Sequence, residues 1–206
     1  VRGRAGSKMS SLASSACSYV RGDRAHAQQR RLHLPLPRRA GDLRQFWKDY
    51  LVGRDQTLGI ELMTSITPYA ELMQEQLRQL ALRPGARVAD VGSGTGALPL
   101  HLAQRPSAPL PLEIVALDFV RAGHLRSRER LAGIAAPAEL VVHYLEVDLE
   151  PAPGRWIPLA DASLDAALAS LFLSYVQEPR ALLAELRRAL RPGGRLLVLE
   201  FSKLQV

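Results

Sequence analysis

The stretch that decides the fold is Arg87-Val-Ala-Asp-Val-Gly-Ser-Gly-Thr-Gly-Ala97. It reads as a short apolar strand that runs through Asp90 into three glycines at alternate positions, Gly92, Gly94 and Gly96. Glycine has no Cβ, so the backbone can turn sharply there and a ligand can lie directly against it. A strand, a glycine turn and a helix form the first unit of a nucleotide-binding α/β fold, whose ligand sits beyond the carboxyl end of the strand. The stretch therefore predicts a cofactor site.

The surrounding sequence alternates between helical and strand patterns. Apolar spacings of three and four predict helices over residues 43–52, 67–82, 96–104, 119–133 and 178–190, and apolar runs predict strands at 87–91, 113–117, 139–147, 164–171 and 195–201. Thr67 is expected to be an N-cap before Pro68, and Gly193 and Gly194 are expected to cap the last helix. The alternation predicts an α/β fold with a doubly wound, mostly parallel Rossmann-like sheet and helices on both faces.

Charge and composition divide the 206 residues into two parts. Residues 1–39 hold nine of the 27 basic residues and one of the 20 acidic ones, so the remainder, with 18 basic and 19 acidic residues, is nearly neutral. We expect residues 1–41 to be a basic, disordered leader, with an organelle transit peptide as the alternative. Residues 42–206 then form the folded domain, with helices over 42–82 and a cofactor-binding core over 85–206. The fifth strand comes just before the end of the sequence, so we expect the sheet to lack its C-terminal strands.

The net charge, the cysteine count and the length of the apolar runs exclude several classes of function. A nearly neutral body argues against a nucleic-acid-binding groove, which needs clustered cations. One cysteine, Cys17, cannot build a disulfide framework or a thiolate metal site, which fits a reducing compartment. No apolar run approaches the roughly 18 residues that cross a bilayer. We therefore expect a cytoplasmic protein without a transmembrane segment, or a mitochondrial matrix protein if the leader is a transit peptide.

The glycine spacing alone leaves the ligand open, because Gly92, Gly94 and Ala97 also satisfy the dinucleotide pattern G-x-G-x-x-G/A. The run Val88 to Gly96, however, resembles motif I of the class I S-adenosylmethionine-dependent methyltransferases. An acid at position 90 would repel a pyrophosphate but suits a ligand that carries an ammonium and a sulfonium. The charge argument therefore favours S-adenosylmethionine over a nicotinamide dinucleotide.

Further motifs extend this resemblance over about residues 85–203. Ile157 to Ala166 resembles the family's proline-containing loop into strand four, and Pro192 to Lys203 is most similar to the C-methyltransferases of ubiquinone and menaquinone biosynthesis. The glycine turn departs from that subfamily, whose usual run is Ala-Gly-Gly-Thr-Gly-Asp. Quinone specificity is therefore a minority hypothesis.

The resemblance also implies roles for acids at the ends of later strands. Asp118, which ends strand two, would accept hydrogen bonds from the ribose hydroxyls, with a helix N-cap as the alternative. Asp148 would end strand three and bind the adenine amino group, with a plain turn residue as the alternative. The full set of predicted cofactor-binding residues is Asp90, Gly92, Ser93, Gly94, Thr95, Gly96, Asp118, Phe119, Asp148 and Leu149.

Methyl transfer from a sulfonium is an in-line displacement that needs positioning and a dry site rather than a metal. The five histidines show no ligand-type spacing, so no metal is expected, and no catalytic base can be named. Phe172, Tyr175 and Trp47 are the candidates for contact with a small-molecule acceptor, with core packing as the alternative. Two other functions stay open: an NAD(P)-dependent oxidoreductase that uses the same turn, and a non-catalytic binding module with a methyltransferase fold.

Overall fold

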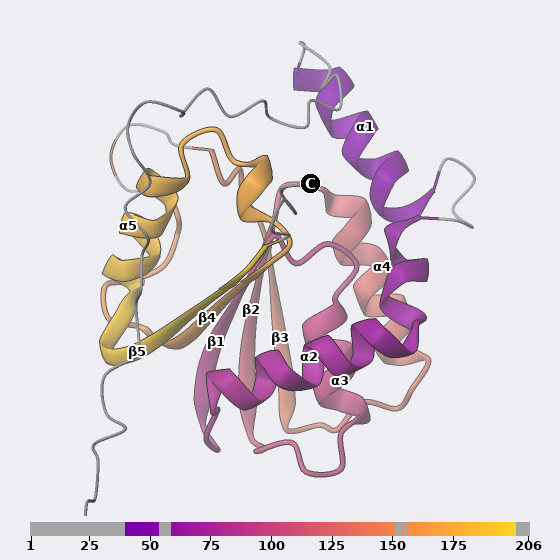
Figure 1. Cartoon of the computed structure of the whole chain (residues 1–206), viewed down its shortest axis with the longest axis vertical. Coiled ribbons are helices and arrows are strands. Elements are labelled where there is room, and N and C mark those ends of the chain that lie inside the picture. Colours follow the sequence, from indigo (N-terminus) through magenta and orange to yellow (C-terminus); the bar gives the residue numbers. More distant parts are fainter. Residues whose placement is uncertain (1–39, 54–58, 151–153, 155, 201–206) are drawn as a thin grey trace, which may run out of the picture. The chain divides into compact units, whose positions relative to one another are not determined.

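The computed structural model describes residues 40–53, 59–150, 154 and 156–200. These residues form a five-stranded parallel sheet with helices on both faces (Figure 1). The strands are β1 (Ala86–Val91), β2 (Leu112–Asp118), β3 (Leu140–Glu146), β4 (Leu164–Ser170) and β5 (Leu190–Leu199). The helices are α1 (Ala40–Val52), α2 (Thr67–Leu80), α3 (Ala97–Gln104), α4 (Arg121–Ala132) and α5 (Pro179–Ala189), and two 3-10 turns are η2 (Ile60–Ser65) and η3 (Leu173–Tyr175). Residues 1–39 of the predicted leader, with Cys17, lie outside the described residues, and its last two residues, 40 and 41, are the first two of α1.

The strand order is β3-β2-β1-β4-β5. The chain therefore builds the sheet outward from β1 through β2 to β3, then crosses back to place β4 on the other side of β1. In doubly wound folds such a reversal marks the place where ligands bind, which in this chain lies at the carboxyl ends of β1 and β4, and we call this place the crevice. The Rossmann-like fold predicted from the sequence is confirmed.

The central strands β1, β2 and β4 are buried on both faces of the sheet, which explains why they read as nearly continuous apolar runs. On one face, Val88 packs in a core with residues of α2 and α3. On the other face, Ala89 and Val91 pack in a second core with Leu182 and Leu186 of α5. In Figure 1, α5 lies to one side of the sheet and α2, α3 and α4 lie to the other.

Three local predictions are wrong. The N-cap of α2 is Ile66 rather than Thr67, which is already helical, and no side chain caps this end. The last helix ends at Ala189 and passes directly into β5, so Gly193 and Gly194 do not cap it. They lie instead within a register shift between β4 and β5, where Leu164 pairs with Leu190 but Ala166 pairs with Arg195. Strand β3 ends at Glu146, so Asp148 lies two residues beyond it.

Candidate cofactor site

The turn after β1 depends on its three glycines. All three have positive φ, +70° at Gly92, +51° at Gly94 and +79° at Gly96, a region that other residues rarely adopt. A Cβ on Gly92 would lie 2.3 Å from the ring of Phe172, and one on Gly96 would lie 1.9 Å from Ser127 Oγ. Both conformation and space therefore require glycine at positions 92 and 96.

The turn is held in place by the end of β2. The amides of Gly92 and Ser93 both donate to the carbonyl of Leu117, at 2.9 and 3.1 Å. The amide of Gly94 donates to Asp118 Oδ2 at 2.8 Å. The amides of these three residues are therefore bound within the protein, and the turn is fixed before any ligand arrives.

Asp90 is buried beneath this turn without a counter-charge. Its side chain comes from the end of β1, the residue is 6% exposed, and Oδ2 has no hydrogen-bond partner in the described part of the chain. Burial, reinforced by the nearby charge of Asp118, raises the pKa of Asp90 to about 7. A buried carboxyl oxygen without a partner costs free energy, so this site is poised to accept a cation or a donor.

Asp118 is placed between the glycine turn and α4. Its Oδ2 accepts from Gly94 and its Oδ1 accepts from the amide of Val120, the N-cap of α4, at 2.8 Å. Burial raises the pKa of Asp118, and these backbone hydrogen bonds oppose the rise. A carboxylate has about four lone-pair sites, so Asp118 keeps acceptor capacity for a ligand hydroxyl beyond its backbone hydrogen bonds.

Two α4 residues that bind the turn were not predicted from the sequence. The Ser93 hydroxyl lies 3.3 Å from His124 Nε2, and burial lowers the pKa of His124 to about 4, which keeps the ring neutral. Arg130 Nη1 donates to both the carbonyl and the hydroxyl of Thr95, and its Nη2 donates to Thr64 of η2. Arg130 thus joins the turn to the segment before α2.

Small residues on α4 allow this close approach. A Cβ on Gly123 would lie 2.7 Å from the carbonyl oxygen of Gly94, and Ser127 occupies the space beside Gly96. With Arg130, these residues are spaced by four and three, which places them on one face of the helix. That spacing was the available signal, because the apolar pattern of α4 is weak and its arginines read as a solvated surface.

The three residues predicted to lie beside the adenine, Phe119, Asp148 and Leu149, have different surroundings in the structure. Leu149 is buried in the core on the α5 side of the sheet. Asp148 is exposed and its Oδ1 accepts from the amide of Glu150 at 3.0 Å, the geometry of a turn residue. Phe119 is half-buried. The guanidinium carbon of Arg44, from α1, lies over its ring at 5.6 Å from the ring centroid.

An aromatic cluster covers the crevice from the side of α1. Trp47 and Tyr175 of η3 meet edge to face with ring centroids 4.8 Å apart, and Tyr50 meets Trp47 in the same way at 5.4 Å. Leu51 reaches the glycine turn itself, since a Cβ on Gly94 would lie 3.2 Å from its side chain. The helix predicted over 43–52 therefore lies against the glycine turn. Of the three acceptor candidates, Trp47 and Tyr175 contact each other, and Phe172 lies beside Gly92.

The residues at this crevice fit S-adenosylmethionine. The glycine turn carries no Cβ at positions 92, 94 and 96, where Phe172, Leu51 and Ser127 lie against it, and Asp90 keeps a buried oxygen that has no hydrogen-bond partner among the described residues. The fold and this site together define a class I methyltransferase, a class whose cofactor is S-adenosylmethionine. Residues 89–198, which are more than half of the chain, match the methyltransferase domain family. The chain belongs to this family.

Comparison with individual proteins agrees with that assignment. The demethylmenaquinone methyltransferase of Renibacterium salmoninarum is 37% identical over 119 residues, which cover 58% of this chain and 43% of the relative. Other curated relatives are named ubiquinone/menaquinone biosynthesis C-methyltransferase. The chain spans about half the length of the curated relatives it matches.

Solved structures share the fold. An S-adenosylmethionine-dependent methyltransferase from Aquifex aeolicus matches with a TM-score of 0.56 at 20% identity, covering 71% of this chain and 73% of that one. The [4+2]-cyclase SpnF matches with a TM-score of 0.54 at 25% identity, covering 63% of this chain and 44% of that one. Among the described residues, no helix is long and apolar enough to cross a membrane.

Proposed function

We propose that this protein transfers a methyl group from S-adenosylmethionine to a small aromatic acceptor, with a quinone-like ring as the specific candidate. The observation that carries the proposal is the buried, unpartnered Oδ2 of Asp90 beside a glycine turn. S-adenosylmethionine brings an ammonium and a sulfonium to such a site, whereas a dinucleotide brings a pyrophosphate that Asp90 would repel. Charge at the crevice therefore separates the two cofactors that the glycine pattern left open.

The proposed cofactor contacts are those that the resemblance to the methyltransferase family implies. Asp90 takes the positively charged end of the ligand, and Asp118 uses its remaining lone pairs for ribose hydroxyls. The backbone of Gly92 to Gly96 forms the surface on which the nucleoside lies. Phe119 and Leu149 would pack against the adenine, and Asp148 would reach the adenine amino group from its turn.

Methyl transfer requires mainly that the acceptor atom and the methyl group are held in line. When bound, S-adenosylmethionine supplies an electrophilic methyl group that an acceptor displaces from sulfur in line. The protein holds the acceptor and excludes water, which in well-oriented systems corresponds to effective molarities of about 10⁵ to 10⁸ M. His124 lies behind Ser93 and is buried, so it does not serve as the base at the acceptor. Burial, together with a hydrogen bond to Tyr50, raises the pKa of Tyr175 to about 12, so its hydroxyl stays protonated.

The aromatic acceptor is supported by the side chains around the crevice. Trp47, Tyr50 and Tyr175 present ring edges and faces, which pack well against a planar ring. The names of the matched relatives point in the same direction, since demethylmenaquinone is a quinone with an apolar tail.

Titration calorimetry with S-adenosylhomocysteine tests the cofactor site. We expect binding to the unaltered chain, and at least a tenfold loss of affinity in Asp118→Ala. Asp118→Asn keeps the shape of the side chain and serves as the folded comparison. Glu139→Ala, at an exposed position before β3, is the second control and should bind S-adenosylhomocysteine like the unaltered chain. Absence of binding, or equal affinity in all four proteins, would count against the site.

Parallel measurements separate the alternative functions. A nicotinamide oxidoreductase predicts that NAD(H), and not S-adenosylhomocysteine, raises the thermal unfolding temperature, and that Asp90→Asn leaves this effect intact. A non-catalytic module predicts S-adenosylhomocysteine binding without methylation of any reduced quinone offered with labelled S-adenosylmethionine. Label in a reduced naphthoquinone or benzoquinone is the result we expect.

A further inference from the structure

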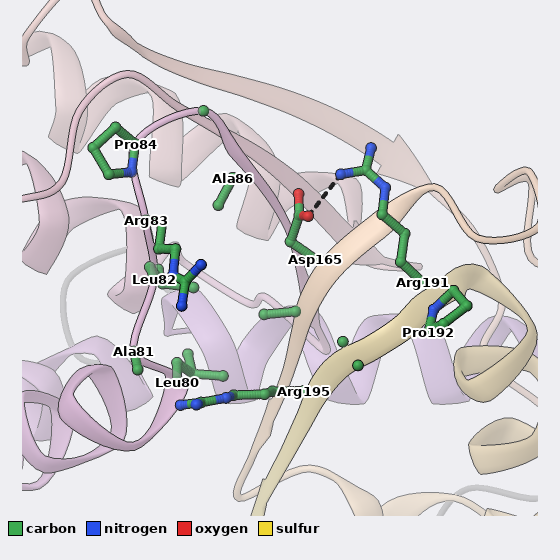
Figure 2. A pocket seen from close by; sticks show the side chains of 14 residues that line it. Leu80, Ala81, Leu82, Arg83, Pro84, Ala86, Asp165, Arg191, Pro192 and Arg195 are labelled. Carbon is green, nitrogen blue, oxygen red and sulfur yellow. Dashed lines mark hydrogen bonds and ion pairs between the residues drawn. The ribbon is translucent and has the colours of Figure 1, made fainter.

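A second hollow lies at the opposite end of the sheet from the glycine turn. It has a volume of about 500 Å³ and is formed where α2 leads into β1 and where β4 and β5 begin. Figure 2 shows its lining, with Arg83 on one side, Arg191 on the other and Arg195 across from both. Because these are the amino ends of parallel strands, the hollow is separated from the cofactor crevice by the length of the sheet.

The charges in this hollow do not cancel. Three arginines line it together with one acid, Asp165. Both oxygens of that acid are engaged, Oδ1 by Arg191 at 2.6 Å and Oδ2 by the amide of Arg87 at 2.8 Å. Within the described residues, Arg83 and Arg195 have no carboxylate partner.

Helix ends offset part of this positive charge. The C-termini of α2 and α5 both end at the hollow, and each contributes about half a negative charge. Arg195 Nη1 donates to the carbonyl of Gln79 in the last turn of α2 at 3.2 Å. One guanidinium N–H therefore interacts with the negative end of the α2 dipole. After Asp165 and both helix ends are subtracted, the lining still carries about one positive charge.

Unused donors face the same space. A guanidinium has five N–H donors, and Arg195 uses one of them in the contact with Gln79. Gly85 and Gly193 have positive φ, and a Cβ at either position would meet nothing within 4 Å. A ligand can therefore approach the backbone between the arginines. Guanidinium groups match the oxygen pairs of phosphate in a fork geometry that a simple point charge lacks.

We propose that this hollow is a second ligand site, and that it binds a phosphate group through Arg83 and Arg195. The site is independent of methyl transfer. The phosphate comes either as the free ion or as part of a phosphate monoester, and the two sources present the same oxygens to the arginines.

Chemical-shift titration of the isotopically labelled full chain with inorganic phosphate tests the proposal, at constant ionic strength set with sodium chloride. We expect saturable shifts at Gly85, Gly193 and Gly194 with a millimolar dissociation constant. Arg83→Ala and Arg195→Ala should each weaken binding at least fivefold. Arg180→Ala removes an exposed cation from the first turn of α5, outside the hollow, and should leave the affinity unchanged. Ribose 5-phosphate in place of phosphate distinguishes a monoester from the free ion.

Equal responses to phosphate and to added chloride would overturn the proposal, because they would show ionic screening alone. Equal weakening by Arg180→Ala would overturn it as well, since net charge would then explain the effect. Thermal unfolding shows whether each variant is folded. Affinity for S-adenosylhomocysteine, measured on the same samples, should not change with any of the three substitutions, so a failure of the cofactor site is distinguishable from a failure of this one.

Discussion

Arg130 of α4 donates from one guanidinium nitrogen to both the carbonyl oxygen and the hydroxyl of Thr95, at 3.0 and 3.2 Å. Its other terminal nitrogen donates to the hydroxyl of Thr64 at 3.0 Å. The glycine turn and η2 are therefore joined through a single side chain. Because η2 follows α1, which covers the crevice, this link connects the shape of the cofactor site to its cover.

Replacing Arg130 by methionine removes three hydrogen bonds while keeping much of the apolar stem. Hydrogen bonds to charged groups contribute about 1.5–3 kcal/mol each where buried, and Arg130 is half-buried, so we expect about a tenfold loss of S-adenosylhomocysteine affinity by calorimetry. Arg126→Met is the matched control, because Arg126 pairs with Glu61 of η2 at 2.8 and 2.9 Å but does not contact the turn. If both variants lose the same affinity for S-adenosylhomocysteine, the loss comes from the contacts of α4 with η2 and not from those with the glycine turn.

Gly96→Ala should destabilise the fold severely, because the new Cβ would overlap Ser127 Oγ at a φ of +79°. Overpacking and a left-handed backbone together cost about 2–4 kcal/mol in the free energy of unfolding by urea. Gly85→Ala is the control, since Gly85 has a φ of +81° with open space around the missing Cβ. It should lose about 1 kcal/mol from backbone strain alone. Similar losses at both positions would contradict the steric account.

The buried carboxyl of Asp90 predicts a pH dependence of stability in the absence of ligand. Its pKa is raised from 3.8 to about 7, so the folded state binds a proton that the unfolded state releases, and the free energy of unfolding falls as pH rises from 4 to 7. At about 1.4 kcal/mol per pH unit between the two pKa values, the loss is at most about 4 kcal/mol. Asp90→Asn should flatten this part of the profile in urea titrations at each pH. A profile unchanged by the substitution would mean that other groups cause the slope.

Cofactor affinity should show the opposite trend. A cationic ligand favours the ionised form of Asp90, so the affinity for S-adenosylmethionine should rise between pH 5.5 and 7 as that carboxyl loses its proton. Calorimetry in buffers of different ionisation enthalpy would measure the proton released on binding. In Asp90→Asn the affinity should be lower and independent of pH over this range. Proton release that persists in the variant would assign the linkage to another group.

Trp47→Leu tests the acceptor side of the crevice. Trp47 packs against Tyr175 and is not among the residues that hold the glycine turn, so we expect a raised acceptor KM of about fivefold or more and an unchanged affinity for S-adenosylhomocysteine. Phe46→Leu offers a comparison on the same helix, because Phe46 packs against Trp47 and Tyr50 but, among the described ring contacts, not against Tyr175. Equal changes in both variants would assign the effect to the stability of α1.

The sequence by itself determined the order of strands and helices, because hydrophobic periodicity depends on residues near one another along the chain. It also determined the glycine turn with Asp90 and Asp118, since a turn without Cβ atoms and acids after buried strands are local patterns. Local patterns were insufficient at Thr67 and at Gly193, where the chain uses a different helix boundary and a strand irregularity.

Only the tertiary structure decided which distant residues complete the site. His124, Ser127 and Arg130 contact the turn because α4 packs against it, and Trp47 contacts Tyr175 across more than a hundred residues of sequence. That Asp90 Oδ2 has no hydrogen-bond partner among the described residues is likewise a property of packing, because the elements around it bring no donor within reach. Such contacts depend on how helices and strands meet in space, and no spacing along the chain encodes them directly.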